Sequence, residues 1–63
     1  DKIFWLGYNA FLTNLHWPPS KIERNFHLTR EWHRGYNRAY FDNQKGKALT
    51  RHEAQDRIAK ARA

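Results

Sequence analysis

The sequence predicts an all-α fold in which two antiparallel helices pack together and a basic helix follows them. Three observations support this class: apolar residues recur at helical spacing in two segments, prolines and a glycine separate the segments, and Ser/Thr-x-x-Glu capping boxes precede two helical runs. The chain has 63 residues and no cysteine, so neither disulfides nor thiolate metal sites support it. We therefore expect its three Trp, three Tyr and four Phe to supply most of a thin core.

The first helix is expected over about residues 2–15. Asp1 can cap its first turn, and Asn14 suits a left-handed conformation at its end. Pro18 and Pro19 then prevent the helix from continuing, because proline lacks an amide donor and restricts the residue before it. The apolar positions at helical spacing are Phe4, Tyr8, Phe11 and Leu15.

The second helix is expected over about residues 30–43, with Thr29 as its N-cap and Gly46 marking the break after it. Between the two helices, the capping-box form of Ser20 and Glu23 predicts a single helical turn. The apolar positions of the second helix are Trp32, Tyr36, Ala39 and Tyr40.

A third helix is expected over about residues 51–62, opened by a capping box at Thr50 and Glu53. Only Leu49 and Ile58 are bulky and apolar here, so we expect this helix to dock loosely or to fray. The chain thus divides into a helical hairpin over residues 1–44 and a basic helical tail over residues 45–63.

The two main helices share a short motif. Phe4-x-x-Gly7-Tyr8-Asn9 recurs twenty-eight residues later as Trp32-x-x-Gly35-Tyr36-Asn37. A glycine inside a helix costs about 1 kcal/mol relative to alanine, so its presence at the same place in two helices requires a reason. Close approach of the two backbones at Gly7 and Gly35 would be such a reason. We expect Phe4, Tyr8, Trp32 and Tyr36 to pack around this helix junction. Coincidence between two aromatic-rich helices is the alternative.

Positive charge is concentrated in the second half of the chain. Twelve Lys and Arg against six Asp and Glu give a formal net charge of +6, which favours polyanions, chiefly nucleic acid. Arg30, Arg34 and Arg38 are spaced four residues apart, which places three guanidinium groups along one helix face, where they can bind phosphates. A merely solvated face is the alternative. The other candidates for nucleic-acid binding are His33 and Asn37 beside this row, and Lys45, Lys47 and Arg51 beyond it.

Two apolar features suggest further contacts. Aromatic residues interleaved with basic ones could stack on unpaired bases, and the candidates are Trp5, Trp17, Tyr40 and Phe41. The first helix has few polar positions, so part of its surface is expected to stay uncovered and to bind a second copy of the chain or a protein partner. The residues expected on that surface are Ile3, Leu6, Ala10 and Trp17.

Catalysis has little support in the sequence. The four histidines form no i, i+4 metal pair, no spacing of carboxylates indicates an acid–base dyad, and there is no glycine-rich phosphate loop. We expect no enzyme, metal, cofactor or small-molecule substrate. The longest apolar stretch is interrupted, is too short to cross a bilayer, and lacks the basic leader and the small-residue cleavage site of a signal peptide. Together with the absence of cysteine, these features predict a cytoplasmic protein without membrane contact.

Over about residues 4–43 the sequence resembles the bacterial ribosome modulation factor family and its small phage- and plasmid-borne relatives. The resemblance lies in Gly7-x-x-Ala10, a proline-bearing connector and Trp32-x-x-Gly35-Tyr36-x-x-Ala39. In that family two short helices are joined by a connector, and the founding members bind the small ribosomal subunit and silence translation. The resemblance implies that the matching residues form the helix–helix junction. These are Gly7, Ala10, Trp32, Gly35, Tyr36 and Ala39.

Together these observations predict a non-catalytic protein that binds structured RNA, ribosomal RNA in particular, and modulates translation. Two alternatives remain open. One is a phage or plasmid regulatory protein that acts through protein contacts of its first helix. The other is a small DNA-binding protein whose second helix enters the major groove with Arg34, Asn37 and Arg38 toward base edges.

Overall fold

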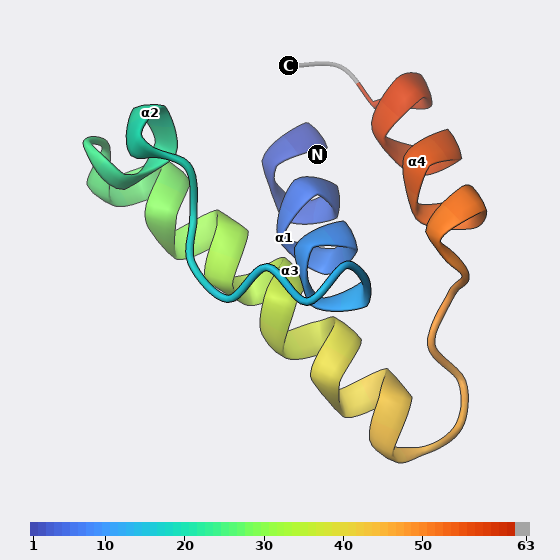
Figure 1. The fold of residues 1–63 in the computed structure, drawn as a ribbon. Coiled ribbons are helices and arrows are strands. Elements are labelled where there is room, and N and C mark those ends of the chain that lie inside the picture. The colour runs from blue at the N-terminus through green and yellow to red at the C-terminus, as the bar shows by residue number, and fades with distance from the viewer. Residues whose placement is uncertain (62–63) are drawn as a thin grey trace.

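The computed structural model describes residues 1–61 and contains four helices (Figure 1). They are α1 (Lys2–Leu12), α2 (Ser20–Glu23), α3 (Phe26–Gln44) and α4 (Arg51–Lys60). No strand occurs in this part of the chain, so the all-α class is confirmed. None of the described helices is both long and apolar enough to span a bilayer.

Helix α1 begins as expected and ends earlier than expected. The Asp1 carboxylate accepts a hydrogen bond of 2.9 Å from the Phe4 amide, which confirms the N-cap. Asn14 has φ 62°, and the Leu15 amide donates to the Ala10 carbonyl at 2.8 Å, so the helix closes with a Schellman motif. This closure ends α1 at Leu12 instead of residue 15.

Helix α3 begins one turn before the expected start. Asn25 is its N-cap and accepts a hydrogen bond of 3.2 Å from the Leu28 amide. The expected cap at Thr29 is wrong, because the hydroxyl of Thr29 donates to the Ile22 carbonyl at 2.8 Å and ties α3 to α2. The single turn expected at Ser20 is present, although Pro19 is its N-cap and no side chain caps it.

Helix α4 is opened by the expected capping box. The Thr50 hydroxyl accepts from the Glu53 amide at 3.1 Å, and the Glu53 carboxylate accepts from the Thr50 amide at 3.0 Å. Gly46 breaks the chain before it with φ 70°. The helix ends at Lys60, and the expected end at residue 62 lies outside the described residues.

The expected antiparallel sense of the two long helices is wrong. Ile3 near the start of α1 and Leu28 near the start of α3 pack against the same cluster and line the same hollow, whereas Phe11 near the end of α1 meets Tyr40, with ring centroids 5.9 Å apart. The helices therefore cross while running in the same general direction. Figure 1 shows the cause: the connector returns from the end of α1 to α2, so α3 starts at the end of the molecule where α1 starts.

The core has two clusters of buried side chains. One contains Ala10, Ile22 and Trp32 and joins α1, α2 and α3. The other contains Tyr8, Ala39 and Ala54 and joins α1, α3 and α4.

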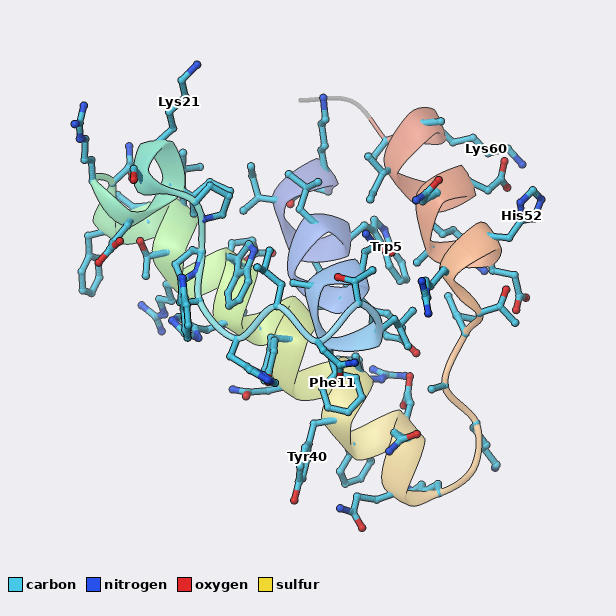
Figure 2. The ribbon with its side chains drawn as sticks, in the orientation of Figure 1. Trp5, Phe11, Lys21, Tyr40, His52 and Lys60 are labelled. Carbon is cyan, nitrogen blue, oxygen red and sulfur yellow. The ribbon has the colours of Figure 1, made fainter. Side chains whose placement is uncertain are left out.

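Helix α4 therefore shares the core, and the expected loose docking is wrong. Ala54 is fully buried, because its small side chain lets α4 approach α1 closely without bulky apolar residues. Trp5 lies between the two helices (Figure 2), and the Arg57 guanidinium lies 5.1 Å from the centre of its ring.

Candidate nucleic-acid interface

The contact between α1 and α3 is closest at two glycines. A Cβ on Gly7 would overlap the carbonyl oxygen of Trp32, and a Cβ on Gly35 would overlap that of Phe4. Both glycines are buried within helices, so their missing side chains allow the two backbones to touch. All eight residues expected at the junction lie at this crossing or in the clusters beside it: Phe4, Gly7, Tyr8, Ala10, Trp32, Gly35, Tyr36 and Ala39.

Aromatic packing sets the rotation of α3 about its axis. Trp32 is 1% exposed and stacks on Tyr36, with ring centroids 5.4 Å apart and planes 18° apart. Phe11 from α1 meets the same tyrosine edge-on at 5.4 Å. Residues two positions apart in a helix point about 200° apart, so burial of Trp32 turns Arg30 and Arg34 outward.

A hydrogen-bond network holds the C-terminal half of α3. The Tyr8 hydroxyl donates to the Asp42 carboxylate at 2.8 Å and accepts from the Leu49 amide at 3.1 Å. Nε of Arg38 donates to the same carboxylate at 3.0 Å. The hydrogen bond from Tyr8, followed by that from Arg38, lowers the pKa of Asp42, whereas burial is the main cause that raises the pKa of Tyr8.

The outward side of α3 carries an exposed arginine face, defined here as Arg30, His33, Arg34 and Asn37. Together with Phe26 and Thr29, these side chains line a shallow hollow of about 390 Å³.

On the other flank of Arg30 and Arg34 lies a second hollow, of about 450 Å³, that also includes the carboxylates of Asp1 and Glu31. The two arginines therefore stand between two hollows of different charge. Arg34 has a contact of 3.6 Å with Glu31, yet 62% of its side chain is exposed.

Arg38 does not belong to the arginine face. Each step of four residues turns the helix about 40° beyond a full turn, so the third arginine of the row points about 80° away from the first. Arg38 instead pairs with Asp42 and lines a different hollow, which also includes Tyr8 and Arg57. The structure thus brings two of the three predicted arginines together on the outward face and pairs the third with Asp42.

The remaining predicted basic residues lie beyond the far end of this face. Lys45 and Lys47 are exposed at the end of α3 and in the loop after it, and Arg51 begins α4. Nζ of Lys45 lies 4.3 Å from the centre of the Phe41 ring. These residues extend the positive field along the molecule and do not line the hollow beside Phe26.

Sequence reasoning missed Phe26, which is 73% exposed at the first position of α3. It was overlooked because the helix was expected to begin after Thr29. Asn25 is an equally good N-cap residue, and its recognition would have placed Phe26 one helical turn before Arg30.

Of the four aromatic residues proposed for base stacking, three are exposed and one is covered. Trp17 is 69% exposed, and Tyr40, which points away from the helices in Figure 2, is 53% exposed. Phe41 is 54% exposed. Trp5 instead packs against Phe4 and Tyr8 beneath α4, at centroid distances of 4.9 and 5.4 Å.

The uncovered surface expected on the first helix is largely absent. Ala10 is only 4% exposed, and Ile3 and Leu6 are half-buried against the cluster around Trp32. The expectation is wrong for these three residues because α2 and α3 cover them. Trp17 alone of that set is exposed.

Searches against protein-family models, curated proteins and solved structures find no match to this chain.

Proposed function

We propose that this protein is a non-catalytic RNA-binding module of the ribosome-modulation-factor type, which binds structured RNA through the arginine face of α3. The observation that carries the proposal is the position of Arg30 and Arg34. Both are exposed, one helical turn apart, on the side of α3 opposite its buried residues. Guanidinium groups in this arrangement match the oxygen atoms of successive phosphates.

The packing of α3 supports this role. The glycine contact and the stacked Trp32 and Tyr36 hold one side of the helix against α1. The bond between Tyr8 and Asp42 holds its C-terminal half. A helix held at both places presents its arginines in a defined geometry, which reduces the conformational entropy lost on binding.

The net charge and the family resemblance indicate the class of ligand. A formal charge of +6 on 63 residues favours a polyanion, and phosphate contacts of this kind bind without reading sequence. The resemblance to ribosome modulation factors singles out ribosomal RNA as the target and a change in translation as the result.

Co-sedimentation with purified bacterial ribosomes across a salt series tests the proposal. We expect the protein to pellet with ribosomes at low salt and to dissociate steeply as salt rises. Free ribosomal RNA should compete for binding, and duplex DNA of equal phosphate concentration should compete less. Preferential competition by duplex DNA would instead establish the DNA-binding alternative, and failure to pellet at any salt would overturn the proposal.

A further inference from the structure

The hollow beside the arginine face has an aromatic wall. Phe26, the most exposed of the large apolar side chains of the described residues, lines it together with Arg30, His33 and Asn37. No carboxylate lines this hollow, whereas Asp1 and Glu31 line the one on the other flank of Arg30 and Arg34. Of the two hollows, the one beside Phe26 is therefore suited to a group attached to a polyanion.

The position of Phe26 has no evident role in the fold. The ring packs in neither core cluster. Among the described residues, its aromatic contact is with His27, edge-on and with ring centroids 5.8 Å apart. Asn25 caps α3 without its help. Exposure of a phenylalanine leaves apolar area in water that a stacked partner would cover.

We infer that this hollow binds one unpaired nucleobase, stacked on the Phe26 ring, while Arg30 and Arg34 bind the adjoining phosphates. Phe26, Arg30 and Arg34 follow one another at steps of four residues, or about 6 Å of helix rise and 40° of rotation per step, and all three line this hollow. The inference rests on the proposed function and specifies its ligand as RNA with a bulged or looped-out base.

The chemistry of the hollow fits a base better than a duplex. A paired base is stacked between its neighbours, so only an unpaired one can offer its face to an aromatic side chain. The Asn37 amide has both donors and an acceptor for the edge of such a base, and the ring nitrogens of His33 add further hydrogen-bonding groups beside it. The volume of about 390 Å³ lies at the lower end of the range of ligand pockets, about 300–1,000 Å³.

The test compares two RNA hairpins with the same stem, one fully paired and one carrying a single bulged 2-aminopurine. We expect the protein to bind the bulged hairpin about tenfold more tightly, since stacking on one aromatic ring is worth about this factor. Binding should also quench the fluorescence of the 2-aminopurine.

Two variants assign the effect to the ring. Phe26→Leu keeps apolar bulk but lacks an aromatic face, so we expect it to lose the preference for the bulge and the quenching while binding the paired hairpin unchanged. Phe26→Trp should retain both. Leu15→Ala is the control, because it removes an exposed apolar side chain outside the hollow and should change neither.

The base site and the phosphate contacts of the arginine face are tested separately by these variants. If Phe26→Leu kept the preference for the bulge and the quenching, the base site would be overturned while RNA binding by the arginines stood. If Arg30→Ala with Arg34→Ala left binding of the paired hairpin unchanged, the proposed function would fall, and the base site with it.

Discussion

Tyr8 on α1 and Asp42 on α3, thirty-four residues apart in the chain, are joined by a hydrogen bond of 2.8 Å. The same tyrosine hydroxyl accepts the Leu49 amide at 3.1 Å, just before α4 begins. One side chain that is 1% exposed therefore connects three helical segments of a chain with a thin core.

Replacement of Tyr8 by phenylalanine should lower the free energy of unfolding by about 1–3 kcal/mol. The substitution keeps the ring but leaves the Leu49 amide without its acceptor and removes one of the two hydrogen bonds to the Asp42 carboxylate, which Arg38 still contacts. An unsatisfied part-buried group costs about this much. Urea denaturation followed by circular dichroism measures the change. Tyr40→Phe, which changes a half-exposed tyrosine, is the control and should have little effect. Equal stability of the two variants would refute the role of the Tyr8 hydroxyl.

The stabilising effect of Asp42 should disappear in acid. The pKa of Asp42 is lowered by the hydrogen bond from Tyr8 and then by that from Arg38. The ionised carboxylate therefore stabilises the fold at pH values above its ordinary pKa of 3.8, and this stabilisation is lost as the pH falls through the lower pKa of the folded state. Thermal melts between pH 7 and pH 2.5 should show Asp42→Asn less stable than the natural chain at neutral pH and the two converging in acid. Asp56→Asn, which removes an exposed pair with Lys60, is the control. A melting-temperature difference independent of pH would contradict the assignment.

Alanine at Gly35 should destabilise the protein, although it raises helix propensity. The added methyl group would overlap the Phe4 carbonyl, so α1 and α3 would have to separate, with a loss of about 1–3 kcal/mol. Gly7→Ala should behave alike, because its methyl group meets Trp32. Thermal denaturation measures the change in stability. Asn43→Ala is the control, because Asn43 is exposed on α3 and alanine there raises helix propensity without an overlap. A more stable Gly35→Ala protein would show that the backbones do not touch.

Leucine at Ala54 tests whether α4 belongs to the core. Because Ala54 is fully buried against Tyr8 and Ala39, the larger side chain should lower stability by about 1–3 kcal/mol. Ala59→Leu places the same side chain at an exposed position of α4 and should be nearly neutral. Similar melting temperatures for the two variants would mean that α4 does not pack as described.

The helices and their glycine contact could be predicted from the sequence because they depend on local spacing. Capping residues at Asp1 and Thr50 and the repeated motif around Gly7 and Gly35 lie within short segments. The sense of the crossing could not be predicted in this way, because it depends on the path of the connector. The close docking of α4 could not be predicted from apolar spacing, because the residue of α4 that is buried in the core is the small Ala54 and not a bulky side chain.

The candidate site was predictable in part. The spacing of Arg30 and Arg34 correctly places both on one exposed face, as the structure shows. The pairing of Arg38 with Asp42 has i, i+4 spacing and could have been found from the sequence. The bond from Tyr8 to Asp42 could not, because nothing local links residues so far apart in the chain.

The salt dependence of RNA affinity tests the central claim most directly. Each phosphate contact contributes about 0.7–0.9 to the slope of log affinity against log salt, so Arg30→Ala with Arg34→Ala should weaken binding and reduce that slope by about 1.4–1.8. Lys2→Ala with Lys60→Ala removes the same charge from α1 and α4 and should leave most of the slope in place. Equal slopes for the two double variants would contradict the claim that the arginine face of α3 binds the phosphates.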